Sequence, residues 1–287
     1  MPSNTLPSSR QIREVVGQAP LIDLQTGLVI LVMTAGFPIV GLLNHRGDLP
    51  WWATVLVGTW LMNLSFTAWH EPAHRNFSRI GWLNTAAGWI ASFASVYPGY
   101  FARRREHLVH HRFEGEEGKD PVYPRIQTSF WLFPLILLRT MFQKAPSGVP
   151  DSFLPMTRGQ RLSDLLSNLL AVALIVGSFW TESWPAVVLV WVIPRGIVFL
   201  VHAYYICFFP HNQGGEGFVV LRIREDHPVM RFLTMNQHLH GIHHRWPWVP
   251  WHQYREVLAA FPEEMSQLEA HTEPNPEHAL ADSASRP

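Results

Sequence analysis

The chain has 287 residues, of which 47% are hydrophobic and 13% aromatic, while only 15% are charged. A typical soluble domain carries about 25% charged residues, so this composition favours a membrane protein. The formal net charge is zero, which gives no indication of nucleic-acid binding. The single cysteine, Cys207, excludes an internal disulfide, an iron–sulfur cluster held by this chain alone and a C-x-x-C metal site. Any metal must therefore be bound through nitrogen and oxygen.

Four apolar runs, arranged in two pairs, predict membrane-spanning helices. The first pair covers residues 26–43 and 51–69, and the second covers 165–180 and 185–209. At about 1.5 Å rise per residue, each run approaches the ~30 Å thickness of the hydrocarbon core. The connections NHRGDLP and TESW are short, and tryptophans cluster near the ends of the runs, as in interfacial belts. We expect two antiparallel helical hairpins.

The distribution of arginine predicts the orientation of these spans. Most arginines, including the run at 103–105, fall on the side that would also hold the N-terminus, and the opposite loops carry only Arg46. By the positive-inside tendency, the arginine-rich side is cytoplasmic. The sequence thus predicts an all-α, multi-pass membrane protein with one domain over residues 1–262. Its helical cytoplasmic cap would comprise residues 70–163 and 210–262.

Four other segments are not expected to span the membrane. Residues 80–100 are uncharged and long enough, but they separate two histidine clusters, so we interpret them as re-entrant or interfacial. Residues 130–142 are too short, and they contain Pro134 and Arg139, which also favours an interfacial position. Residues 263–287 are polar and are predicted to be a disordered tail. The N-terminal segment lacks a compact apolar core, so we expect no cleavable signal peptide.

Half of the sixteen histidines fall into three short clusters. These boxes are His70 and His74 in H-x-x-x-H, His107, His110 and His111 in H-x-x-H-H, and His240, His243 and His244 in a second H-x-x-H-H. Positions i, i+3 and i+4 share one face of a helix, so each box can present its imidazoles in one direction. Eight histidines suit two ions better than one tetrahedral zinc. Imidazole binds several metals, but only a redox-active one can activate a lipid C–H bond, which favours iron.

Four segments carry a resemblance to the membrane-bound fatty acid desaturase and hydroxylase superfamily, whose histidine boxes bind two iron ions. The segments are HEPAHRN (70–76), REHLVHHRFEGEEGKDP (105–121), FFPHN (208–212) and NQHLHGIHHRWPWVPWHQY (236–254). Within the superfamily, the chain most resembles the desaturase-type beta-carotene hydroxylases. The motifs cover the predicted cytoplasmic half of the protein.

The resemblance implies a set of site residues. The eight box histidines would be metal ligands, and His211, directly after the fourth run, would be a supplementary ligand. His238 could bind metal or hydrogen-bond to a ligand, and Asn236 and Asp120 could fix imidazole tautomers. No catalytic residue beyond the ligands and no organic cofactor site is implied. His202 is expected to hydrogen-bond within the helix bundle.

The implied activity is O2-dependent hydroxylation of a lipid C–H bond in carotenoid biosynthesis, with two iron ions and an external electron donor such as a ferredoxin with its reductase. Desaturation or hydroxylation of an acyl lipid by the same kind of site is the alternative. Two departures from the family pattern bear on the substrate: the first box reads His70-Glu71-Pro72, and two additional residues follow His238. Pro72 is also expected to kink the helix or start a new one.

Two other classes of function fit some of the same residues. HEPAH matches the H-E-x-x-H pattern of zinc metalloproteases, but a protease would leave both H-x-x-H-H boxes unexplained. A metal or haem carrier, or a histidine-based pH sensor, would not require this spacing. The oxidoreductase interpretation accounts for all three boxes.

Overall fold

The computed structural model describes residues 6–95, 99–126, 128–141, 148–150, 153–211 and 228–267. Within these ranges the chain is helical, with one isolated β-bridge between Ile22 and Ser78 and no strand, as predicted. It divides into two compact units, each built from separate stretches of sequence. Unit 1 comprises 1–19, 106–155 and 203–287, and unit 2 comprises 20–105 and 156–202.

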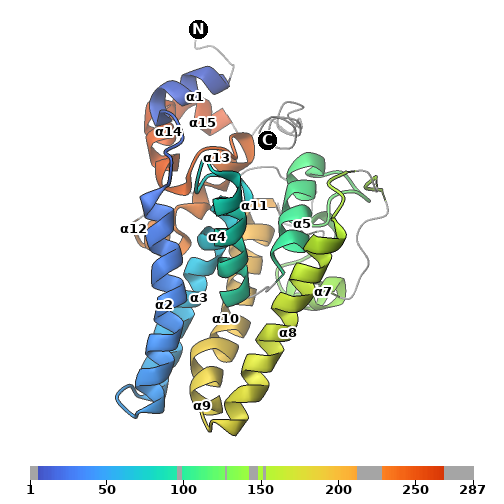
Figure 1. The fold of residues 1–287 in the computed structure, drawn as a ribbon. Helices are drawn as coiled ribbons and strands as arrows, with labels where there is room; N and C mark the ends of the chain where they lie inside the picture. Colours follow the sequence, from blue (N-terminus) through green and yellow to red (C-terminus); the bar gives the residue numbers. More distant parts are fainter. Residues whose placement is uncertain are drawn as a thin grey trace. The chain divides into compact units, whose positions relative to one another are not determined.

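Unit 2 contains the long helices. These are α2 (Leu24–His45), α3 (Trp51–Ala73), α4 (Gly81–Ala94), α8 (Arg158–Trp180) and a continuous helix made of α9 (Trp184–Val187), the π-helical turn η1 (Val188–Val192) and α10 (Ile193–His202). In Figure 1, α2 and α3 form one hairpin, and α8 is joined to α9 by a short turn. Local caps set the beginnings of two helices: Asp23 accepts the Thr26 N–H at 2.7 Å, and Thr157 forms a capping box with Gln160.

Three segments are long and apolar enough to cross a membrane. They are Leu24–His45, Arg158–Trp180 and Trp184–His211. Much of their apolar surface is exposed, for example at Leu165, Leu169 and Val172 of α8. Exposed apolar surface of this extent is typical of a lipid-facing helix. These segments contain three of the four predicted spans, those at 26–43, 165–180 and 185–209.

The fourth predicted span, 51–69, forms most of α3 but is not one of these three segments. Helix α3 has 23 residues, yet it carries Thr54, Asn63 and Ser65, and its C-terminal half is buried inside unit 2. It packs against α2, α4, α10 and η1. At Gly58 the helices approach closely, since a Cβ there would lie 2.6 Å from the Val190 carbonyl oxygen. The crossing of α3, and with it the four-span topology, stays a prediction.

The segment 80–100 contains the 14-residue helix α4. Fourteen residues measure about 21 Å along a helix, which is shorter than a ~30 Å hydrocarbon core. The Trp191 indole donates to the Ala94 carbonyl at 2.8 Å and holds the end of α4 on η1. Residues 96–98 lie outside the described residues. The length of α4 agrees with a segment that does not cross, and its interfacial position stays a prediction.

Unit 1 is assembled from shorter helices around a small apolar core. Its elements are α1 (Ser9–Val16), most of α5 (Tyr100–Phe113), α6 (Tyr123–Ile126), α7 (Phe133–Met141), η2 (Ala203–Phe208), α11 (Phe209–His211), α12 (Pro228–Thr234), η3 (Gln237–Leu239), α13 (His240–Arg245), η4 (Trp251–Gln253), α14 (Tyr254–Ala260) and α15 (Pro262–Gln267). Its core includes Ile12, Ile242, Trp246 and Tyr254. Helix α1 thus packs with α13 and α14 although they are far apart in sequence (Figure 1).

The structure changes two predicted boundaries. Residues 70–105, predicted to be part of the cap, belong to unit 2 with the long helices. Helix α15 reaches Gln267, and Met265 is buried, so the predicted disordered tail is wrong for residues 263–267. The apolar side chain of Met265 completes the core of unit 1, which explains why a polar segment is ordered there. Residues 268–287 lie outside the described residues, and a single domain over 1–262 stays a prediction.

Candidate metal centre

Two of the three histidine boxes lie in unit 1, and both are on helices. His107, His110 and His111 are on α5, and His240, His243 and His244 make up half of the six-residue helix α13. The helical spacing expected from H-x-x-H-H is therefore present in both boxes.

The start of α5 is held by Asp164 of α8, within unit 2. Its carboxylate accepts the backbone N–H groups of Phe101 and Ala102 at 3.0 and 2.8 Å. Asp164 is buried, so this cap satisfies two donors in the first turn of α5 that would otherwise lack a helical acceptor.

Three imidazoles from the two boxes form the first group of possible ligands. In this group, His107, His111 and His243 offer ligand atoms within 4.8 Å of one another. The Nε2 atom of His111 lies 3.1 Å from that of His107 and 2.9 Å from that of His243. Between two neutral rings, only one nitrogen of such a pair can donate. One cation could instead accept the lone pairs of all three Nε2 atoms.

The second group combines three imidazoles with a carboxylate. His110, Glu114, His211 and His244 offer ligand atoms within 4.8 Å of one another, and the three histidines are buried. Glu114 Oε1 lies 3.0 Å from His244 Nδ1 and 3.4 Å from His211 Nδ1. The two groups interleave, because α5 supplies His107 and His111 to one and His110 to the other.

Two side chains lie within hydrogen-bonding distance of the Nδ1 atoms of these imidazoles. Asp120 Oδ1 lies 2.9 Å from His110 Nδ1, and the Tyr254 hydroxyl lies 3.2 Å from His243 Nδ1. A proton on Nδ1 of His110 leaves Nε2 as the nitrogen with a lone pair. Such partners fix the tautomer and the orientation of metal-binding histidines. Asp120 therefore has the contact expected of it, whereas Tyr254 was not singled out from the sequence.

The electrostatics of the second group favour a cation. The pKa of Glu114 is raised to about 8, mainly by burial and to a smaller extent by Asp120, although the charge of His110 opposes them. Burial and the neighbouring imidazoles hold the pKa of His244 well below its usual value, so this ring is neutral at pH 7. Burial alone would raise the pKa of Asp120, but His110 and backbone N–H donors outweigh it and lower the pKa. Burial alone would lower the pKa of His110, but Asp120 and Glu114 outweigh it and raise the pKa. The group thus places imidazoles beside buried carboxyl groups, whose charge a divalent ion would neutralise.

Three further residues were predicted for the site, and they belong to neither group within unit 1. His240 Nε2 is 2.8 Å from His244 Nε2, so His240 adjoins the second group. His238 is on η3, and its Nδ1 atom lies 2.9 Å from the Thr234 hydroxyl. Asn236 has a left-handed φ of 62° at the start of η3 and donates to the Trp251 carbonyl at 3.2 Å. Roles in metal binding for these three stay predictions.

The first box lies in unit 2, at the C-terminal end of α3. The ring centroids of His70 and His74 are 4.8 Å apart, so the two side chains share one side of the chain. Helix α3 continues through Pro72 and ends at Ala73, so of the two predicted effects of Pro72, a kink or a new helix, the start of a new helix is wrong. The last carbonyls have partners from α5: the Tyr100 hydroxyl donates to Pro72 O at 3.3 Å, and Arg104 Nε donates to Ala73 O at 2.8 Å. These contacts replace the helical bonds that a C-terminus lacks.

Glu71 belongs to a buried contact network around the same box. Its Oε1 atom lies 3.1 Å from His70 Nδ1, and its Oε2 atom accepts from the Asn76 amide at 3.1 Å. Phe66 stacks on the His70 ring with centroids 4.8 Å apart. Glu71 thus supports His70 as Asp120 supports His110. His202 lies 3.2 Å from Asn63 Oδ1, which confirms the hydrogen bond expected within the bundle.

Comparison with known protein families decides between the interpretations of these boxes. The family described as Fatty acid desaturase matches residues 49–273, well over half of the chain, and all three boxes fall inside the match. The chain belongs to the fatty acid desaturase family. Searches among curated proteins and among solved structures gave no significant match.

Membership of the fatty acid desaturase family has direct consequences. It makes the chain a desaturase- or hydroxylase-type oxidoreductase, and together with the three candidate spans it makes the chain a multi-pass integral membrane protein. It accounts for all three boxes, which the protease interpretation of HEPAH does not. The resemblance to beta-carotene hydroxylases stays a prediction.

One residue of the second group, Glu114, was missed by sequence reasoning. It lies four residues after His110, a spacing that places two side chains on one helical face, and this could have indicated it. Glu114 was not singled out because Glu116 and Glu117 follow it closely, and the side chains of such acidic runs are usually exposed to solvent.

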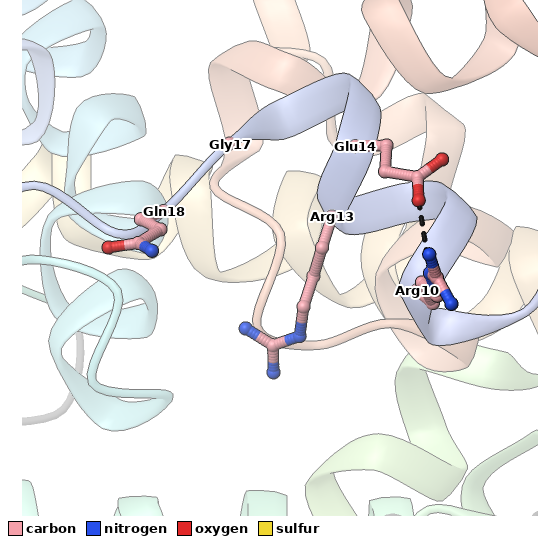
Figure 2. A pocket seen from close by; sticks show the side chains of 5 residues that line it. All are labelled: Arg10, Arg13, Glu14, Gly17 and Gln18. Atoms are coloured by element: carbon pink, nitrogen blue, oxygen red, sulfur yellow. Dashed lines mark hydrogen bonds and ion pairs between the residues drawn. The ribbon is translucent and has the colours of Figure 1, made fainter.

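A shallow hollow on the surface lies away from any histidine of the boxes. It is lined by Arg10, Arg13, Glu14, Gly17 and Gln18 of α1 and the residues that follow it (Figure 2). Arg10 pairs with Glu14 at 3.2 Å, and the Arg13 guanidinium lies 4.3 Å above the Trp248 ring. These contacts stabilise the packing of α1 in unit 1 and suggest no chemistry.

Proposed function

We propose that this member of the fatty acid desaturase family is a di-iron oxidoreductase that uses O2 and external electrons to hydroxylate a lipid C–H bond. The observation that carries the proposal is the interleaving of the two H-x-x-H-H boxes. Helix α5 and helix α13 each contribute to both groups of possible ligands, so two ions would be held side by side by the same pair of helices.

The proposed ligands extend beyond these two groups. The first ion would be bound by His107, His111 and His243, and the second by His110, His211 and His244. We add His240, which lies beside His244, and His70 and His74 of the first box, whose rings lie on one side of α3. The match to the family over all three boxes supports including the first one.

The donor set fits iron. It consists of imidazole nitrogens and carboxylate oxygens without sulfur, and imidazole and carboxylate are common ligands of non-haem iron. When bound, a pair of iron ions supplied with O2 and electrons provides the oxidising power that breaking a strong C–H bond requires. The contribution of this chain is to orient the imidazoles and to fix their tautomers. Asp120, Glu71 and Tyr254 do so through Nδ1 of His110, His70 and His243.

A lipophilic substrate is supported by the surroundings of His211 in unit 1. Aromatic rings of Tyr204, Phe208 and Phe209 precede His211 in the same helix and pack with Phe130 and Phe133. Trp131, next to this cluster in sequence, is 83% exposed. A long polyene could stack on such rings. We therefore propose a carotenoid as substrate, with an acyl lipid as the alternative.

Expression in a host that makes beta-carotene, together with a ferredoxin and its reductase, tests the proposal. Profiling pigments and fatty acids in the same cultures separates the two substrates: new polar xanthophylls support the carotenoid, and a changed acyl profile with unchanged pigments supports the acyl lipid. His243→Ala should abolish either activity. His45→Ala, at an exposed position outside all three boxes, serves as the matched control and should keep it. Full turnover by the His243→Ala variant would contradict the proposed site.

Metal analysis of the purified protein tests the class of reaction. The proposal expects two iron ions per chain. One zinc ion per chain without iron would instead support the protease interpretation of HEPAH.

A further inference from the structure

Glu114 is an acidic side chain placed among histidines. It directly follows α5, four residues after His110, and its side chain is only 11% exposed. The neighbouring Glu117 is exposed, and Glu116 pairs with Lys119 at 2.6 Å. Of the three glutamates in this segment, Glu114 is the one directed toward the second group of ligands.

The contacts of Glu114 are not those of a hydrogen-bonding partner. Its Oε1 atom lies 3.0 Å from His244 Nδ1, but the orientation of the two groups does not make a hydrogen bond, and neither atom has a hydrogen-bond partner among the described residues. Asp120, which lies behind His110 and outside the group, behaves differently, since it hydrogen-bonds to His110 Nδ1 at 2.9 Å and accepts two backbone N–H groups. The two carboxylates therefore have different roles.

The distances around Glu114 match those between ligands of one ion. Two donor atoms bound at about 2.1 Å are about 3.0 Å apart when their bonds are at right angles, and about 3.4 Å apart at a tetrahedral angle. Glu114 Oε1 lies 3.0 Å from His244 Nδ1 and 3.4 Å from His211 Nδ1. A cation among these atoms would satisfy a buried carboxylate oxygen that a hydrogen bond does not.

We propose that the Glu114 carboxylate is a direct ligand of the ion bound by His110, His211 and His244. This inference rests on the proposed di-iron function and adds to it a chemical difference between the two ions. Within unit 1, the described residues of the first group are all histidines. The second group also contains a carboxylate. Carboxylate oxygen is a hard, anionic ligand, so the second position should bind iron more tightly than the same imidazoles would without it.

Anaerobic titration of the metal-free, full-length protein with Fe2+ measures the effect directly. Wild-type protein should bind two ions per chain. Glu114→Gln keeps the size of the side chain but removes the anionic ligand, so it should bind the second ion more than about 100-fold more weakly, beyond the range for loss of an orienting partner. Glu117→Gln makes the same chemical change at an exposed site and should bind two ions as the wild type does.

Infrared difference spectra between Fe2+-loaded and metal-free protein add a readout that a structural role would not give. A carboxylate stretching band should shift on loading in the wild type and in Glu117→Gln, and this shift should be absent in Glu114→Gln. If Glu114→Gln folds poorly, Glu114→His provides the second variant, because it restores a ligand and should restore the second ion.

The outcomes separate the two proposals. Two ions bound with wild-type affinity by Glu114→Gln, or a carboxylate band that persists in it, would overturn the role of Glu114 and leave the di-iron function standing. Fewer than two ions in the wild type would overturn the di-iron function itself.

Discussion

Asp120 Oδ1 lies 2.9 Å from Nδ1 of His110, and both side chains are buried. The carboxylate is itself held by the backbone N–H groups of Gly115 and Val122 at 3.0 and 2.8 Å. His110 is thereby fixed in one orientation by a group that cannot easily move. An ion that binds His110 through Nε2 gains a ligand whose tautomer is already set.

Asp120→Asn tests this relationship. The amide can still contact His110, but it lacks the charge that favours a proton on Nδ1, so we expect a 10- to 100-fold loss of iron affinity at the second group. Asp48→Asn, in the exposed turn after α2, is the matched control. Iron titration of the metal-free protein is the measurement. Unchanged affinity in Asp120→Asn would show that the contact is structural only.

Tyr254→Phe tests the corresponding partner of His243. The phenyl ring still fills the fully buried site, whereas the hydroxyl 3.2 Å from His243 Nδ1 is lost. We expect iron affinity at the first group to fall about 10-fold, with a change in unfolding free energy of about 1 kcal/mol. Tyr123→Phe, at a half-buried position, should leave the affinity unchanged. A large loss of stability without a change in affinity would assign Tyr254 to the core alone.

Tyr100 links the start of α5 to the first box and predicts a pH dependence. Burial raises the pKa of its hydroxyl to about 12, although the charges of Arg104 and Arg75 lower it. A folded-state pKa above the unfolded value of about 10 stabilises the fold fully below pH 10, and this stabilisation is lost as the pH rises toward 12. Tyr100→Phe should cost about 1 kcal/mol at pH 8 through the lost bond to Pro72 O. Its unfolding midpoint in detergent should also fall less steeply than that of the wild type between pH 10 and 12.

The sequence predicted the elements of the site better than their assembly. Spacing alone indicated that His107, His110 and His111 share a helical face, and this is confirmed on α5. It could not indicate that α5 and α13 would divide their histidines between two groups, because that depends on tertiary packing. The sequence also left open whether α3 would continue through Pro72 or a new helix would start there, and it continues. This continuation is possible because the helix ends one residue later and its carbonyls find partners on Tyr100 and Arg104.

Three of the four apolar runs in the sequence correspond to candidate membrane spans in the structure, whereas the run in α3 does not. A run of apolar residues describes both a lipid-facing helix and a helix buried among others. Helix α3 is flanked by α2, α4 and α10, and its C-terminal half is covered by protein, whereas Trp51, Trp52 and Leu56 in its first turns are exposed. Asn63, in the middle of the helix, hydrogen-bonds to His202. The π-helical turns η1 and η2 in the last span were likewise invisible, since one additional residue per turn leaves no mark on composition.

Asp164 connects α8 to the helix that carries the second box. Asp164→Ala would leave the N–H groups of Phe101 and Ala102 without their buried acceptor, which should cost about 2 kcal/mol of unfolding free energy. Because α5 carries His107, His110 and His111, iron affinity at both groups should fall with it. Asp164→Asn keeps one acceptor oxygen but places an NH2 donor against the other backbone N–H, so it should lose at least half as much. An unchanged free energy of unfolding in Asp164→Ala would show that α5 does not require the cap.

The predicted orientation places Asp48 and Glu117 on opposite sides of the membrane, and both are exposed. Cys207 is the only native cysteine, so a Cys207→Ser background allows each position to be tested with a single introduced cysteine. In inside-out vesicles, an impermeant maleimide should label Glu117→Cys and not Asp48→Cys. In intact cells whose outer layers let the maleimide reach the membrane, it should label Asp48→Cys and not Glu117→Cys. Labelling of both cysteines from the same side would mean that the chain crosses the membrane an even number of times, or not at all, between them. In that case either α3 does not span, so that α2 crosses without its hairpin partner, or both α3 and the segment 80–100 cross; each outcome would replace the four-span topology.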